Sequence, residues 1–144
     1  VVRHNPRYAR KDGPVEFPVL PREGLDLRRV TFLTSDWTAS ASELLIVALG
    51  DHIRVTTVGG KTTGKGMGCR LYWSGGWYLC AMDSEFTGVK GTAVPPDGIR
   101  PDIGVKDDFR LPLGDPEEPL LKAAIAHIVE KGHVGPDLRQ PRSR

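Results

Sequence analysis

The chain has 144 residues, of which 39% are hydrophobic and 26% are charged, proportions that are typical of one modest globular domain. Its 20 basic and 18 acidic residues leave a net charge of +2, which points to no nucleic-acid partner. No apolar run reaches the length of a membrane-spanning segment, and two cysteines are too few for a disulfide framework. The chain starts at Val1 rather than Met and shows no signal peptide, so we expect a piece of a longer or processed protein.

The first part of the chain predicts a strand–helix–strand unit that follows an irregular start. Residues 1–27 are rich in Pro, Arg and Gly and are expected to be irregular apart from one short strand. The β-branched and aromatic run 28–35 predicts a strand, and 53–59 predicts a second one. Between them "SASELLIVALG" (40–50) predicts a helix that is apolar on nearly every side and therefore buried, with Gly50 ending it. This succession is typical of a right-handed parallel crossover.

The middle of the chain predicts an antiparallel hairpin. The run "CRLYWSGGWYLCAMD" (69–83) has strand-forming residues on both sides of Gly75-Gly76, a dipeptide that is typical of a two-residue turn. Cys69 and Cys80 would then lie on facing strands, where a disulfide is geometrically allowed. Two buried free thiols agree with the sequence at least as well.

The C-terminal part predicts an edge strand and an amphipathic helix. The segment "GIRPDIGV" (98–105) combines a turn with a short strand, and Pro101 favours an edge position over a central one. Residues 115–132 predict the helix, with Asp115 as its cap and Pro116 in its first turn. The apolar stripe of this helix comprises Leu121, Ala124, Ile125, Ile128 and Val129.

The glycine-rich stretch "VGGKTTGKGMG" (58–68) raises a nucleotide-binding alternative. From Gly59 it reads G-x-x-x-x-G-K-G, one residue away from the phosphate-binding loop G-x-x-x-x-G-K-[ST]. Gly66 stands where that loop needs a hydroxyl for magnesium, and the residues after it predict a strand instead of the required helix. We therefore keep nucleotide binding only as a remote alternative.

The expected parallel topology brings two loops to the same sheet edge, where sites form in α/β folds. One loop holds Ser40 at the start of the helix, and the other holds Lys65, 25 residues later. A serine here can attack a carbonyl carbon while the backbone N–H of Ala41 faces the developing oxyanion. A neutral lysine can take the serine proton, and burial lowers the pKa of a lysine toward that state. The histidines are scattered without a pattern that suits a base: His4, His52, His127 and His133.

The same residues also have ordinary structural explanations. Ser40 and Glu43 form S-x-x-E, a capping box that requires no catalysis and is the favoured interpretation on this motif alone. By itself, Lys65 is most simply interpreted as a solvated loop lysine, and Thr38 and Thr62 as turn residues.

Taken together, however, the ordered motifs resemble the C-terminal processing (tail-specific) serine peptidases. The segment "TASASE" (Thr38–Glu43) is similar to the segment with which that family enters a buried helix. The loop that ends in "GKG" (64–66) is similar to the family's glycine-rich lysine loop, at the same spacing of 25 residues. The segment from Gly98, "GIRPDIGV", looks like the family's G-I-x-P-D-I segment.

This resemblance implies an α/β core like that of the crotonase and Clp-peptidase group. Residues 28–132 would be the C-terminal part of the catalytic domain, and 133–144 would be a disordered tail. Ser40 would be the nucleophile, Lys65 the general base, and Ala41 N–H an oxyanion-hole donor, with no metal or cofactor. The implied substrate is a polypeptide with an apolar C-terminal tail, which a PDZ domain usually binds. The implied location is the bacterial periplasm or cell envelope, and the oligomeric state stays open.

The chain departs from the family pattern at two points. Cys69 stands where the family often has a glutamine that orients the lysine, and a thiol is a poor hydrogen-bond partner for an amine. The upstream glycine-containing segment that supplies a second oxyanion donor is absent, and losing one such donor commonly costs about a hundredfold in rate. A non-catalytic relative that binds tails, or a fragment inactive by itself, therefore stays open as an alternative.

Overall fold

The computed structural model of the chain describes residues 2–4, 28–108, 110–112 and 114–131. Most of the predicted irregular start and all of the predicted disordered tail therefore lie outside the described residues. No helix within the described ranges is long and apolar enough to cross a bilayer.

The predicted strand–helix–strand unit is confirmed and forms the centre of the molecule. Strands β2 (Arg29–Thr34) and β3 (Arg54–Gly59) pair in parallel over their whole length, and helix α1 (Ala41–Gly50) connects them. Strand β6 (Ile103–Gly104) pairs in parallel with the other side of β3, so it is the edge strand that Pro101 indicated. The sheet order β2-β3-β6 leaves β3 in the middle.

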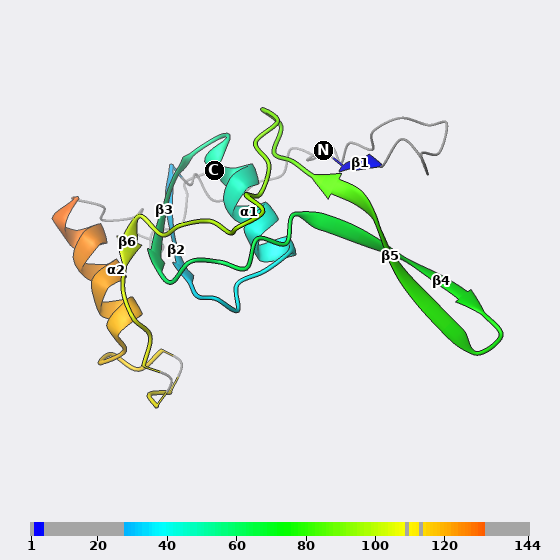
Figure 1. Cartoon of the computed structure of the whole chain (residues 1–144). Helices are drawn as coiled ribbons and strands as arrows, with labels where there is room; N and C mark the ends of the chain where they lie inside the picture. The colour runs from blue at the N-terminus through cyan, green and yellow to red at the C-terminus, as the bar shows by residue number, and fades with distance from the viewer. Residues whose placement is uncertain (1, 5–27, 109, 113, 132–144) are drawn as a thin grey trace, which may run out of the picture.

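Helices α1 and α2 (Pro119–Glu130) lie on opposite sides of this sheet (Figure 1). Helix α1 is less buried than predicted, because only one side of it packs onto the sheet and Leu45 is 50% exposed. Gly50 is the last helical residue, as predicted, but the helix is capped by Asp51 in right-handed conformation instead of by a left-handed glycine. The buried apolar side chains are Ile46, Val47, Val58, Val94, Leu120 and Ala124.

The predicted start of the C-terminal helix was wrong by three residues, because the cap is Glu118 and not Asp115. The helix begins at Pro119, and the carboxylate of Glu118 accepts hydrogen bonds from the N–H groups of Leu120 and Leu121 at 2.9 and 2.8 Å. A helix that began at Pro116 would need an N–H at position 119, which proline lacks. Asp115 instead accepts a bond from Glu117 N–H in a preceding turn. Of the predicted apolar stripe only Ala124 is fully buried, whereas Ile125 and Val129 are 50% and 71% exposed.

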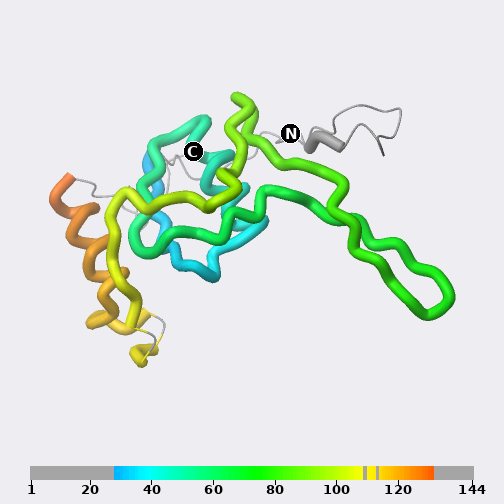
Figure 2. The backbone as a smooth tube through the Cα atoms, in the orientation of Figure 1, coloured from blue at the N-terminus to red at the C-terminus, as the bar shows by residue number. Residues whose placement is uncertain are grey.

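The predicted hairpin forms a second, projecting sheet. Strands β4 (Met67–Ser74) and β5 (Trp77–Phe86) pair antiparallel, and β1 (Val2–His4) pairs with the other side of β5. Gly75 and Gly76 have φ values of 56° and 84°, the left-handed conformations that a tight two-residue turn requires. Figures 1 and 2 show that the hairpin extends away from the β2-β3-β6 sheet.

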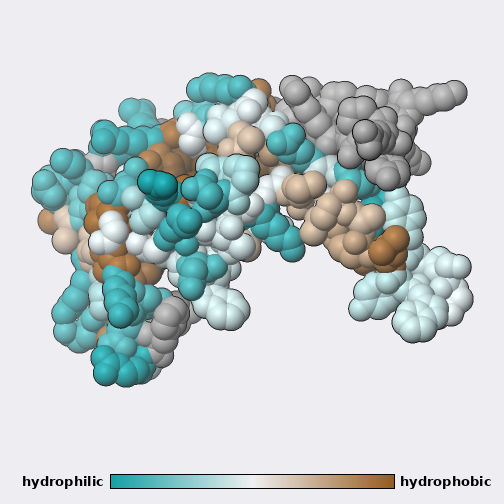
Figure 3. Space-filling view, viewed as in Figure 1, coloured by the Kyte–Doolittle hydropathy of each residue, from teal (hydrophilic) through white to brown (hydrophobic). Residues whose placement is uncertain are grey.

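The end of this hairpin is aromatic and exposed. The rings of Trp73 and Tyr78, which lie opposite each other on β4 and β5, stack with their centroids 6.0 Å apart. In Figure 3 the end of the hairpin is pale or brown instead of teal, because it carries no charged side chain. Its large exposed side chains are Leu71, Tyr72, Trp73, Trp77, Tyr78 and Leu79.

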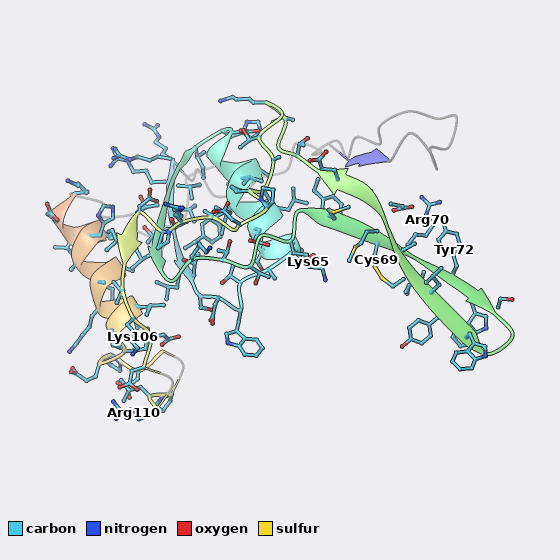
Figure 4. All side chains as sticks on the ribbon, viewed as in Figure 1. Lys65, Cys69, Arg70, Tyr72, Lys106 and Arg110 are labelled. Atoms are coloured by element: carbon cyan, nitrogen blue, oxygen red, sulfur yellow. A yellow bond between two sulfur atoms is a disulfide. The ribbon has the colours of Figure 1, made fainter. Side chains whose placement is uncertain are left out.

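A disulfide joins Cys69 on β4 to Cys80 on β5, with the two Cα atoms 5.8 Å apart (Figure 4). Of the two alternatives that the sequence left open, the bridge is therefore confirmed. The alternative of buried free thiols is wrong, because both cysteines lie at exposed positions of a hairpin that packs on little else.

Reduction of this disulfide is expected to loosen the hairpin and to leave the β2-β3-β6 sheet folded. A bridge between residues 11 positions apart contributes roughly 2–3 kcal/mol by restricting the unfolded chain. Hydrogen–deuterium exchange of the β4 and β5 amides should therefore accelerate by roughly 30-fold or more on reduction, with β3 unaffected. A Cys69→Ser/Cys80→Ser double variant should match the reduced protein and show no response to reductant. Equal exchange in β4 before and after reduction would contradict this prediction.

Candidate active site

The loops that follow β2 and β3 lie side by side, as the parallel topology predicted. Loop 35–40 and loop 60–66 are joined directly by Thr63. Its backbone N–H donates to the carbonyl oxygen of Thr38 at 2.9 Å, and its hydroxyl donates to that of Asp36 at 2.8 Å. The loop that holds the predicted nucleophile and the loop that holds the predicted base therefore form one hydrogen-bonded unit.

Ser40 has an unusual backbone conformation. It is the N-cap of α1, with φ 57° and ψ −117°, and it is the only non-glycine residue of the described ranges with a positive φ. An ordinary N-cap residue adopts the extended region, so a capping role does not account for this geometry. Such a conformation costs about 1–3 kcal/mol and is found mostly at functional sites. A strained serine at the start of a helix is also how α/β-hydrolases expose a nucleophile.

The backbone N–H of Ala41 is available beside Ser40. Ala41 is the first residue of α1, and its N–H has no acceptor among the described residues. The N–H groups on either side of it are occupied, since Ser40 donates to Glu43 at 2.9 Å and Ser42 donates to Ala39 at 3.3 Å. An unpaired N–H at a helix N-terminus can stabilise negative charge that develops next to Ser40.

Glu43 connects the two loops from inside the molecule. Its side chain is fully buried, at 0% exposure, in the first turn of α1. One carboxylate oxygen accepts two bonds from the lysine loop, and the other accepts one bond from each loop. The donors are Ser40 N–H (2.9 Å), Thr62 O–H (2.5 Å), Gly64 N–H (2.7 Å) and Lys65 N–H (2.8 Å).

These hydrogen bonds keep Glu43 ionised. Burial raises the pKa of a carboxyl group, but the bonds from Thr62, Gly64, Lys65 and Ser40 together outweigh it and hold the pKa of Glu43 below its ordinary value of 4.5. Glu43 is therefore a fixed acceptor and not a general acid. Of the predicted capping box, the bond from Ser40 N–H to the Glu43 carboxylate is present, and it accounts for only one of the four donors.

Thr62 is a structural part of the site instead of a simple turn residue. It is 3% exposed, and its hydroxyl donates to Glu43 while accepting a bond from Ile99 N–H at 2.7 Å. Gly64 and Gly98 have φ values of 88° and 90°, and a side chain on either one would collide with the backbone of the other segment. The glycines of this loop therefore allow close packing. Because β4 begins at Met67, directly after the loop, the helix that a phosphate loop requires is absent from this point and the nucleotide alternative is wrong.

The structure holds the Lys65 backbone but leaves its side chain exposed. Lys65 N–H is bonded to Glu43, and Figure 4 places the side chain beside the start of α1. No hydrogen bond joins the Lys65 ammonium to the Ser40 hydroxyl within the described residues. The burial that would favour a neutral Lys65 is therefore not provided by the described residues.

A comparison with known protein families identifies the family of this chain. A model of peptidase family S41 matches residues 4–105, which include both loops, the hairpin and β6. The chain belongs to peptidase family S41. The predicted resemblance to a family of serine peptidases is therefore confirmed at the level of the family. Helix α2 lies outside the matched residues.

Two solved structures are similar to parts of this S41 chain. A crystal structure from Bacteroides fragilis assigned as an S41 protease matches with a TM-score of 0.64 at 23% identity, over 73% of this chain and 28% of that one. The photosystem II D1 C-terminal processing protease matches with a TM-score of 0.45 at 30% identity, over 53% of this chain and 20% of that one. The first match shows the shared fold, and the chain spans only about a quarter of that structure's length. A comparison with curated proteins gives no match.

Cys69, at the possible lysine-orienting position, is not a free thiol in this S41 chain. Its sulfur is bonded to Cys80. Glu43 orients the backbone of Lys65. Sequence reasoning missed this role, although a buried glutamate in an apolar helix always requires partners, and the "GGKTTGKG" loop is rich in backbone donors.

The segment from Gly98, which looks like the family's G-I-x-P-D-I segment, forms hydrogen bonds to the lysine loop and to β3 of this S41 chain. Ile99 bonds to Thr62 as described, and its carbonyl oxygen accepts Thr62 N–H at 3.0 Å. Asp102 accepts bonds from the N–H and the hydroxyl of Thr57 at 2.7 and 2.9 Å, which fixes β6 against β3. The third motif is therefore explained by packing and needs no catalytic role.

Proposed function

We propose that this chain is part of the catalytic domain of a serine endopeptidase of the C-terminal processing type, in which Ser40 is the nucleophile and Lys65 the general base. The observation that carries the proposal is the strained conformation of Ser40 at the start of α1, on a loop that Glu43 connects to the Lys65 backbone. The three ordered motifs support it, since they resemble this branch of serine peptidases.

In this mechanism a neutral Lys65 takes the proton of the Ser40 hydroxyl while the serine oxygen attacks the carbonyl carbon of the scissile bond. The negative charge moves to the former carbonyl oxygen, which accepts a hydrogen bond from Ala41 N–H. Collapse of this intermediate breaks the C–N bond, and the lysine ammonium returns its proton to the leaving amine. Water then hydrolyses the acyl-serine ester by the same steps. The reaction requires no metal or cofactor.

The remaining parts of the site would come from outside this chain. Because the chain spans 28% of the matched Bacteroides fragilis structure, we propose that upstream residues supply a second oxyanion donor and cover Lys65 from water. We propose a polypeptide substrate with an apolar C-terminal tail. The disulfide favours an oxidising compartment, which supports a location in the bacterial periplasm or cell envelope.

A second candidate is a non-catalytic relative that binds polypeptide tails without cutting them. The exposed side chain of Lys65 and the loss of the lysine-orienting position to a disulfide both favour it. It differs from the peptidase in predicting no acyl-enzyme.

The full-length protein tests both candidates when it is incubated with an unfolded reporter that ends in an apolar tail. A peptidase is expected to cleave this reporter faster than a copy with a polar tail, and a fluorophosphonate probe should label Ser40, since the probe reacts with activated serines. Mass spectrometry identifies both the products and the labelled residue. Binding of the reporter with neither cleavage nor labelling would establish the tail-binding candidate instead.

A further inference from the structure

An exposed tryptophan lies next to the proposed nucleophile. Trp37 is three residues before Ser40 in loop 35–40, and its side chain is 82% exposed. The indole is therefore open to contact by a bound molecule in this structure. Three residues of chain span at most on the order of 10 Å, which places Trp37 within reach of any polypeptide bound at Ser40.

The exposure does not result from a loose loop. Trp37 N–H donates to the Ser35 hydroxyl at 3.2 Å, and Thr38 N–H donates to the Ser35 carbonyl oxygen at 3.0 Å, which closes a turn with Trp37 at its outer corner. Ser35 N–H also donates to the Thr38 hydroxyl at 3.0 Å. The backbone therefore holds the indole outward.

The lysine loop fixes Trp37 from the other side. Thr63, two residues before Lys65, bonds to the carbonyl oxygens of Asp36 and Thr38, the two chain neighbours of Trp37. Trp37 thus projects from the point where the two loops of the site are joined. This point is three residues from Ser40 and, through Thr63, two residues from Lys65.

We propose that Trp37 is a specificity-determining residue that packs against an apolar substrate side chain close to the cleaved bond. This inference rests on the proposed function, because it assigns a substrate to the same site. A rigid aromatic ring offers a large contact area and loses little conformational entropy on binding. It selects substrates with Leu, Met or Phe near the cut over those with Ser, Asp or Lys. Discrimination of this kind is worth roughly 10- to 200-fold in kcat/KM.

The hairpin supplies a matched control. Trp77 is also 82% exposed, but it is the first residue of β5 and pairs with Ser74 at the end of β4, about 25 Å along the strand from the lysine loop. Replacing either tryptophan removes the same exposed area, and only Trp37 is near the site.

The test compares Trp37→Ala, Trp37→Phe and Trp77→Ala in the full-length protein on paired peptides that carry Leu or Ser at one position within three residues of the cut. Trp37→Ala is expected to lower kcat/KM for the Leu peptides by about 10-fold or more and to leave the Ser peptides nearly unchanged. Trp37→Phe should retain part of the preference, and Trp77→Ala all of it. An equal loss on both peptides, or an unchanged preference, would overturn the proposal in favour of a packing role for Trp37.

A binding measurement separates failure of this inference from failure of the proposed function. Fluorescence anisotropy of the same labelled peptides is measured with Ser40→Ala, with and without Trp37→Ala. If the protein never cleaves but Trp37→Ala still weakens binding of the Leu peptide selectively, the peptidase proposal fails and the specificity assignment stands. If cleavage depends on Ser40 but neither cleavage preference nor binding depends on Trp37, only the specificity assignment fails.

Discussion

Replacing Ser40 with Ala is expected to lower peptide-bond cleavage by the full-length protein by about 10⁴-fold or more, because the variant lacks the hydroxyl that forms the acyl-enzyme. The variant should remain folded, since the N–H that Ser40 donates to Glu43 belongs to the backbone and is retained. Initial rates on the unfolded apolar-tail reporter measure the loss, and urea unfolding measures the stability. Cleavage by Ser40→Ala within tenfold of the wild type would show that the nucleophile lies elsewhere.

Lys65 should be equally sensitive, and two replacements separate its charge from its basicity. Lys65→Ala removes both, whereas Lys65→Arg keeps a cation that cannot act as a base near neutral pH. Both are expected to abolish cleavage if Lys65 takes the serine proton. Activity retained by Lys65→Arg would instead assign a purely electrostatic role.

Ser42→Ala is the matched control for Ser40→Ala, because Ser42 is an exposed serine in the same helical turn. This variant should cleave the reporter at the wild-type rate.

The second large effect is expected at Glu43. Glu43→Ala leaves four donors in the interior without an acceptor, and the expected loss in the free energy of unfolding is roughly 3–5 kcal/mol. Glu43→Gln should lose less, because one amide oxygen still accepts, although its NH₂ group faces donors. Cleavage should fall with both, since the two loops are no longer held together. Urea unfolding checks the stability, with Glu130→Ala on the exposed end of α2 as the control.

The contribution of Glu43 should also depend on pH. Its pKa is lowered in the folded state, so its stabilising effect is fully present above the ordinary value of 4.5 and is lost as the pH falls through the lower folded value. The stability difference between the wild type and Glu43→Gln should therefore narrow from about pH 6 to about pH 3. A difference that grows in acid would contradict the ionised state of Glu43. Denaturant midpoints at several pH values measure it.

The sequence by itself determined the elements whose signals are local. The β-branched run before Ser40, the apolar run after it and the Gly75-Gly76 turn each depend on residues close in the chain, and all three elements form as predicted. The order of strand, helix and strand was enough to bring Ser40 and Lys65 to one sheet edge. The ordered motifs were enough for the peptidase family.

Only the tertiary structure decided the features that depend on distant residues. Either Pro116 or Pro119 could be the first residue of α2. The helix begins at Pro119, where the Glu118 carboxylate accepts hydrogen bonds from the next two N–H groups. The burial of α1 depends on whether another segment covers the side of the helix that faces away from the sheet. The apolar composition of the helix therefore led us to expect more burial than the structure shows. The roles of Glu43 and Thr62 come from hydrogen bonds between segments about 20 residues apart or more. No local pattern contains that information, because burial and hydrogen-bond partners are set by which segments the fold places in contact.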